Sequence, residues 1–176
     1  MLTNMSDNIL IRPYQPADSI PEITVLLHKA FAKLAGQGML YLASHQSDLI
    51  TQDRLIQGAS FIAVKDSAIV GTITVYGPYQ EAEVPLYRRE GVYHFGQYAV
   101  DPDLQGSGLG RRLYMTIENY CKAKKVQTLA LDTAETASQL IELYQRWGFK
   151  IVDRVKWDVV NYRSVIMAKD LLQGLQ

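Results

Sequence analysis

The stretch that decides the fold is Tyr98-Ala99-Val100-Asp101-Pro102-Asp103-Leu104-Gln105-Gly106-Ser107-Gly108-Leu109-Gly110-Arg111-Arg112-Leu113. Its pattern is that of a strand, a tight turn and a helix. Glycine stands at every second position from 106 to 110, and residues without a Cβ allow a sharp turn whose amides point inward. An apolar stripe follows at helical spacing: Leu109, Leu113, Thr116, Ile117 and Tyr120. The turn therefore lies at the positive end of a helix dipole, which predicts a site for a phosphorylated ligand.

The spacing of the glycines narrows the kind of phosphate site. A dinucleotide fingerprint would need a glycine at Arg111, and a Walker loop would need Gly-Lys-Ser/Thr; the sequence has neither. The run Gln105–Gly110, preceded by Val100-x-Pro102, instead resembles the acyl-CoA pyrophosphate loop (Q/R-x-x-G-x-G/A) of the GNAT N-acetyltransferases.

Composition sets the class of protein. The chain has 176 residues, 48% hydrophobic and 20% charged, which is typical of one soluble globular domain. Its 18 basic and 18 acidic residues give no net charge, so nothing favours nucleic acid or an anionic membrane as a partner. A single cysteine, Cys121, excludes an internal disulfide and suits a reducing compartment, and no apolar run is long enough to span a bilayer. We expect a cytoplasmic protein, with a flexible polar N-terminus (1–8) that is no secretory signal, and a single domain over 9–172.

Periodicity predicts the order of the elements. The expected elements are a strand at 9–12, a helix from a cap at Asp18 or Ser19 to Gly36, a short helix from an Asp48 cap to Gly58, strands at 61–64 and 69–76 joined by a turn, a strand at 92–100, a helix at 109–124, a strand at 128–131, a helix from about 136 to Gly148, and strands at 151–157 and 162–167.

Two irregular segments have two interpretations each. Residues 36–47 form either a wall of an acceptor pocket or a simple connection, with equal support. Residues 79–91 mix charges of both signs with aromatic side chains; this suits either a polar acceptor site or an exposed loop, and we slightly favour the loop.

A second motif extends the resemblance. Leu143-Tyr144-Gln145-Arg146-Trp147-Gly148-Phe149 is similar to the family's LY-x-x-x-GF segment. Together with the order of the elements, the two motifs extend the likeness over nearly the whole chain. The resemblance implies an α/β fold: a single GNAT-like domain with a central twisted, mixed, mostly antiparallel sheet of about seven strands flanked by about four helices.

The resemblance also implies the chemistry. Family members transfer an acetyl group directly from acetyl-CoA, a co-substrate, to a primary amine in a ternary complex, without a metal. The backbone of Tyr98, Ala99 and Val100 would bind the pantetheine arm at a splay in the sheet, and the Val100 N–H would steady the carbonyl oxygen. The pyrophosphate would be held by the amides of Gln105, Gly106, Ser107, Gly108, Leu109 and Gly110, with Arg111 adding charge.

Two side chains are candidates for the proton transfers. Tyr144 matches the tyrosine that in the family donates a proton to the departing thiolate; without the glycine loop it would be taken for a core residue. His94 occupies the place where many members carry a glutamate base. A neutral histidine can take this role, but a structural histidine with a water as base is the alternative. The sequence departs from the family pattern a second time at Ala137, where relatives often have an asparagine that contacts the CoA arm. Ser138 or Thr133 would supply the lost side-chain contact.

The sequence therefore predicts a cytoplasmic acetyl-CoA-dependent N-acetyltransferase acting on a small-molecule or peptide amine, and a homodimer through the closing strands is possible. Two other hypotheses stay open: a catalytically silent acyl-CoA-binding sensor or interaction module, and a nucleotide-binding fold with a chance glycine loop. The acceptor itself is left open among metabolites, antibiotics, polyamines and protein amino groups.

Overall fold

The computed structural model describes residues 8–172, so the predicted flexible N-terminus lies outside the described residues except for Asn8. Seven strands form one sheet in the order β1-β2-β3-β4-β5-β7-β6. The strands are Ile9–Pro13 (β1), Ala59–Lys65 (β2), Ala68–Tyr76 (β3), Val92–Val100 (β4), Thr128–Ala134 (β5), Lys150–Lys156 (β6) and Arg163–Asp170 (β7). The α-helices are Ile20–Gly36 (α1), Asp48–Ile56 (α2), Leu109–Ala123 (α3) and Ser138–Arg146 (α4), and short 3-10 helices are Leu42–Ser44 (η1), Pro85–Arg88 (η2) and Pro102–Leu104 (η3).

The sheet is mixed and mostly antiparallel, as predicted. Among the described strands only β4 and β5 pair in parallel, and the other neighbours are antiparallel. The predicted seven strands, four helices and their order along the chain are confirmed.

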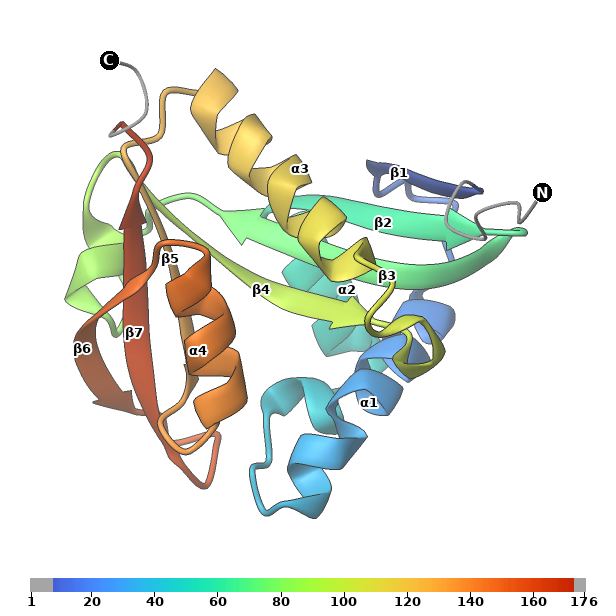
Figure 1. Ribbon diagram of the computed structural model, residues 1–176, viewed down its shortest axis with the longest axis horizontal. Helices are drawn as coiled ribbons and strands as arrows, with labels where there is room; N and C mark the ends of the chain where they lie inside the picture. Colours follow the sequence, from blue (N-terminus) through green and yellow to red (C-terminus); the bar gives the residue numbers. More distant parts are fainter. Residues whose placement is uncertain (1–7, 173–176) are drawn as a thin grey trace.

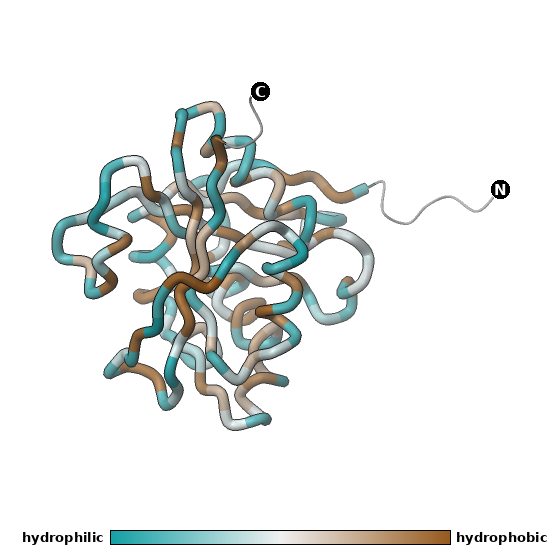
Figure 2. Tube along the Cα trace, turned by 60° about the vertical axis from the view of Figure 1, so that its left-hand side comes forward, coloured by the Kyte–Doolittle hydropathy of each residue, from teal (hydrophilic) through white to brown (hydrophobic). Residues whose placement is uncertain are grey.

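Helices cover both faces of the sheet because alternate strand residues point to opposite sides. In β2, Ala63 belongs to the core under α3, whereas Ile62 belongs to the core under α1 and α2. Figure 1 shows α3 and α4 on the near face of the sheet and α2 behind it. Hydrophobic stretches run through the middle of the molecule, and most outer turns are hydrophilic (Figure 2). None of the helices within residues 8–172 is long and apolar enough to cross a membrane.

The caps of α1 and α2 follow the expected chemistry with one correction. Ser19, one of the two predicted caps, accepts a hydrogen bond from the Glu22 N–H at 3.3 Å. The cap of α2 is Ser47 rather than Asp48, because the Ser47 Oγ accepts from the Ile50 N–H at 3.3 Å. Asp48 instead occupies the first turn of α2, where its charge favours the helix dipole.

The segment 79–91 is only in part the exposed loop that we favoured: its charged residues are exposed, but three of its apolar residues are buried. It contains η2, and its Tyr87 is only 2% exposed. Ala82 and Val84 are buried with it in a small core against β5 and β7. The segment is therefore anchored to β5 and β7 by its apolar residues, while its charged residues face solvent.

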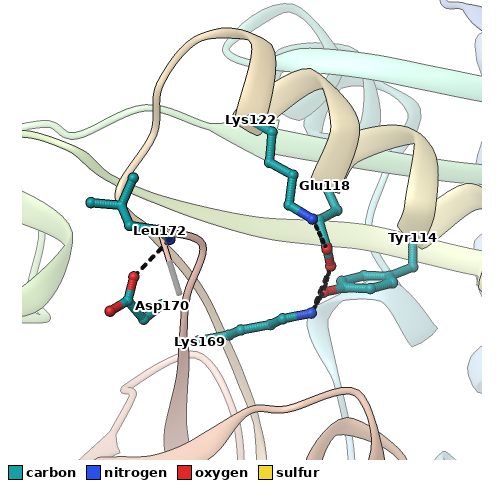
Figure 3. A network of polar contacts seen from close by, with 6 residues as sticks. All are labelled: Tyr114, Glu118, Lys122, Lys169, Asp170 and Leu172. Atoms are coloured by element: carbon teal, nitrogen blue, oxygen red, sulfur yellow. Dashed lines mark hydrogen bonds and ion pairs between the residues drawn. The ribbon is translucent and has the colours of Figure 1, made fainter. Parts of the chain in front are cut away.

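A charged network joins α3 to β7 (Figure 3). The carboxylate of Glu118 accepts hydrogen bonds from Lys122 at 2.7 Å and from Lys169 at 2.8 Å, and a third from the Tyr114 hydroxyl. Glu118 is 4% exposed. Burial alone would raise its pKa, but these hydrogen bonds outweigh burial and lower the pKa to about 2. Lys122, in the last turn of α3, is thus part of a specific ion pair.

Candidate active site

The strands β4 and β5 separate in the middle of the sheet. They pair only over Val92–His94, and Figure 1 shows them diverging beyond that point. Gln97 has a φ of 47°, and β4 holds one more residue than β3 between its pairings at Gly96 and Ala99. Such a bulge bends a strand and ends its regular pairing. The edge of β4 that carries Tyr98, Ala99 and Val100 lies beyond the last pair with β5 and has no pairing to that strand.

Two cavities lie where the strands separate. The larger measures about 610 Å³ and the smaller about 370 Å³. Five residues belong to the lining of both cavities: Arg54, Tyr79, Phe95, Gly96 and Asp132. The two cavities are therefore neighbouring parts of one site at the splay.

The glycine turn has the backbone that its sequence predicts. Gly106 and Gly108 have φ of +81° and +85°, in the left-handed region, and an added Cβ at either would meet nothing within 4 Å. A side chain in this region costs about 1–2 kcal/mol, so glycine is favoured by the backbone. The space over the turn is open, and Gly108 caps α3, whose first N–H groups have no partner within the helix. These features fit a bound pyrophosphate.

The third glycine of the turn has a different role. A Cβ on Gly110 would lie 2.9 Å from the Tyr98 hydroxyl oxygen, and that hydroxyl donates to the Gly110 carbonyl at 2.6 Å. Gly110 therefore lets α3 approach β4 closely, and the side chain of Tyr98 fixes the two together.

Arg111 lies beside aromatic rings at the start of α3. Its guanidinium carbon is 5.0 Å from the ring centre of Trp147 and 5.4 Å from that of Tyr114. Cation–π contacts of this kind hold the side chain while its charge stays exposed. Arg111 is thus placed to meet an anionic group near the turn.

Tyr144 of α4 lines the smaller cavity. It is 8% exposed, and its ring packs edge-on against Phe95 and Phe149. Burial raises its pKa well above the ordinary value, and Tyr98, Tyr41 and Asp132 add to the rise. The phenol therefore keeps its proton at neutral pH, as a proton donor must.

His94 lines the larger cavity and not the smaller one. Its ring stacks on Tyr87, with centres 4.0 Å apart and planes 4° apart, and on Tyr76 at 5.1 Å. Burial, with a contribution from Arg54, lowers its pKa to about 4, so the imidazole is neutral at pH 7. Its Nδ1 is buried without a hydrogen-bond partner in residues 8–172. His94 and Tyr144 thus reach the site from its two different cavities.

Two charged residues of the site were missed from the sequence. Asp132 and Arg54 line both cavities. Asp132 is the single charged residue of β5, and the predicted strand stopped one residue short of it. Burial raises its pKa, although the Tyr87 hydroxyl, which donates to Oδ1 at 3.3 Å, and the Arg54 charge oppose this. The sequence signal that could have identified Asp132 was a single carboxylate in an otherwise apolar strand. No comparable signal marked Arg54, because a charged residue on an amphipathic helix is ordinary.

The two irregular segments supply walls of the site. Tyr41, Leu42 and Ala43 line the smaller cavity, which favours the interpretation of 36–47 as a pocket wall, and Tyr79 lines both cavities. The Tyr41 hydroxyl bonds to the Thr133 Oγ1 at 2.8 Å. Thr133, proposed as a substitute for an asparagine at Ala137, is therefore already engaged with this wall.

Comparisons with known proteins agree with this geometry. The profile of the Acetyltransferase (GNAT) family matches residues 27–149. The chain belongs to the GNAT acetyltransferase family. A curated GNAT-type relative, the S-(2-succino)cysteine N-acetyltransferase of Bacillus subtilis, is 29% identical over 135 residues, which cover 76% of this chain and 78% of that protein.

Solved structures share the GNAT fold. A GNAT family acetyltransferase from Elizabethkingia anophelis with acetyl-CoA bound superposes with a TM-score of 0.65 at 20% identity, covering 93% of this chain and 99% of that one. The ribosomal-protein-S18-alanine N-acetyltransferase from Escherichia coli gives 0.70 at 18% identity, covering 93% and 94%. At these identities the likeness establishes the fold of this GNAT protein.

Proposed function

We propose that this protein is an N-acetyltransferase that moves an acetyl group from acetyl-CoA to a primary amine in a ternary complex. The observation that carries the proposal is the splay between β4 and β5, where the cavity lined by Tyr144 meets the cavity lined by His94. The open glycine turn beside α3 and the curated relative named as an N-acetyltransferase support it.

The co-substrate is held by the backbone and by Arg111. The free edge of β4 at Tyr98, Ala99 and Val100 binds the pantetheine arm, and the turn from Gln105 to Gly110 binds the pyrophosphate. The thioester end then lies at the splay, where the Val100 N–H polarises the carbonyl.

The reaction exchanges one bond to the acetyl carbon for another. The amine nitrogen attacks the thioester carbonyl carbon, the C–N bond forms and the C–S bond breaks. The nitrogen loses a proton to His94, Tyr144 gives its proton to the departing thiolate, and solvent restores both side chains. The products are the N-acetylated amine and CoA.

The pKa of Tyr144 is compatible with proton donation. A phenol with a raised pKa is a weaker acid, but the same burial raises the pKa of a thiol: that of Cys121, buried in the core, rises to about 12. A thiolate that leaves into an apolar part of the cavity is likewise a stronger base than in water, which offsets the weaker acidity of the phenol.

The proposal is tested in two steps. Acetyl-CoA is expected to raise the melting temperature, and a panel of amines is expected to contain one that releases CoA thiol with formation of the acetylated product, seen by mass spectrometry. Binding of acetyl-CoA without release from any amine class would contradict transferase activity. Stabilisation by ATP or NAD and not by acetyl-CoA would contradict the co-substrate.

The free thiol of Cys121 also supports our inference that the protein works in the cytoplasm, where thiols stay reduced. Fractionation of cells with an antibody to the protein tests this location.

A further inference from the structure

Two opposite charges share the cavities at the splay without pairing with each other. Arg54 reaches the site from α2, and Asp132 from β5. Within residues 8–172 neither is among the side chains at ion-pairing distance of an opposite charge. A positive and a negative group therefore stand in one site, each available to a ligand.

The guanidinium of Arg54 is fixed by a neutral scaffold. Its Nη1 donates to the Gln46 Oε1 at 2.7 Å, and the Gln46 Nε2 donates to Thr51 and to Gln97, each at 2.7 Å. Gln46 and Gln97 are 1% and 3% exposed. Because its hydrogen-bond partner within residues 8–172 is an uncharged amide, Arg54 is oriented while its charge is not neutralised.

Arg54 lies next to β4 where that strand separates from β5. A Cβ placed on Gly96 would lie 3.3 Å from the Arg54 Nη2. Gly96 lies two residues beyond His94, the last residue of β4 that pairs with β5, and two residues before the segment expected to hold the pantetheine arm. The glycine leaves room for the guanidinium at the junction of the two cavities.

Asp132 faces the same junction. It interrupts an otherwise apolar strand, its side chain is accessible through the cavities, and one oxygen accepts from the Tyr87 hydroxyl at 3.3 Å. That hydroxyl orients the carboxylate without cancelling its charge.

We propose that the acceptor is a compact zwitterion, an amino acid or related aminocarboxylate, whose carboxylate binds Arg54 and whose amino group binds Asp132. This rests on the proposed function, because it names the acceptor of that same site. The amino group binds as the ammonium, gives one proton to solvent in the cavity, and then attacks as the neutral amine. Guanidinium forks bind carboxylates in a bidentate manner, and a charged hydrogen bond is stronger than a neutral one. A polyamine or other polycation would meet the charge of Arg54 and is disfavoured. A cavity of about 370 Å³ beside one of about 610 Å³ has room for an amino-acid side chain.

The test compares acids with their amides. The twenty L-amino acids and S-(2-succino)cysteine, each beside its α-carboxamide, are assayed for thiol release with acetyl-CoA. The amide keeps the amine and the side chain and loses one charge. The best acid is expected to have a kcat/KM about 10- to 100-fold above that of its amide, the size of one charged hydrogen bond.

Variants assign this preference to residues. Arg54→Gln is expected to bring the ratio of kcat/KM for the acid to kcat/KM for the amide down to about one, and Arg54→Lys to restore part of this ratio. Asp132→Asn is expected to raise KM for both. Arg146→Gln, an exposed position on α4, is the matched control and should change neither. Melting temperatures check that each variant is folded.

Binding gives a readout independent of turnover. Titration of the same acid and amide into the protein saturated with CoA should show the same ratio, abolished by Arg54→Gln. Amides used as well as acids, or release with polyamines or peptides only, would overturn the zwitterion and leave acetyl transfer intact. Arg54-dependent binding of acids without any release would support the zwitterion site and refute the proposed transfer. Absence of both binding and release would refute both.

Discussion

Replacing Glu118 with glutamine tests how α3, the helix behind the glycine turn, is attached to β7 (Figure 3). In the folded protein the pKa of this carboxyl lies at about 2 against an ordinary value of 4.5. Each pKa unit corresponds to about 1.4 kcal/mol, so the ionised carboxylate contributes about 3 kcal/mol to the free energy of unfolding at pH 7. For a domain of this size we expect Glu118→Gln to lower the melting temperature by about 6–12 °C.

The pH dependence has a definite sign. Because folding lowers the pKa of Glu118, its contribution is complete above pH 4.5 and is lost as the pH falls toward 2. Glutamine does not ionise, so the difference in stability between wild type and variant should shrink from pH 5 to pH 3.

Urea unfolding followed by circular dichroism at pH 7, 5, 4 and 3.5 measures this difference. Glu142→Gln on α4 is the control, because Glu142 is exposed and should change stability by less than about 0.5 kcal/mol. A loss below about 1 kcal/mol at pH 7, or a loss of the same size at every pH, would refute the reasoning from the network.

Three further predictions concern the site. Tyr144→Phe keeps the ring packing against Phe95 and should lower kcat about 100-fold or more, with the melting temperature and acetyl-CoA affinity unchanged; an unaltered kcat would remove Tyr144 from catalysis. Gly108→Ala, at φ +85°, should cost about 1 kcal/mol and raise KM for acetyl-CoA, whereas Gly36→Ala at the end of α1 should not; equal effects would contradict the role of the turn. With His94 as the base, kcat/KM should fall as the pH drops through about 4. A fall near pH 6.5 that is present in the wild type and absent in His94→Asn would instead show that His94 titrates at its ordinary pKa.

Local patterns predicted most of the fold. The hairpin at Asp66 and Ser67, the helix from Leu109 and the glycine after α4 follow from the chemistry of neighbouring residues: both turn residues and Gly148 have positive φ. The element bounds differ by a few residues, and the cap of α2 moved from Asp48 to Ser47 because two adjacent polar residues compete for one role.

The packing of the segment 79–91 could not be predicted from local sequence patterns. Its charges suggested an exposed loop, but its apolar residues pack against β5 and β7, and Tyr87 stacks on His94. That ring lies seven positions from His94 in the sequence, and no periodicity connects the two. The low pKa of His94 follows from this burial and from Arg54, so it could not be read from the sequence.

By itself the sequence determined the phosphate-binding turn from Gln105 to Gly110, the strand and helix around it, and Tyr144 as a candidate acid. These depend on backbone freedom and spacing, which are properties of contiguous residues. Only the tertiary structure decided how the glycines divide their roles, with Gly106 and Gly108 open to a ligand and Gly110 packed on Tyr98. It alone also brought Arg54, His94 and Asp132 to one site, because the separation of β4 from β5 beyond His94 depends on contacts between residues far apart in the chain.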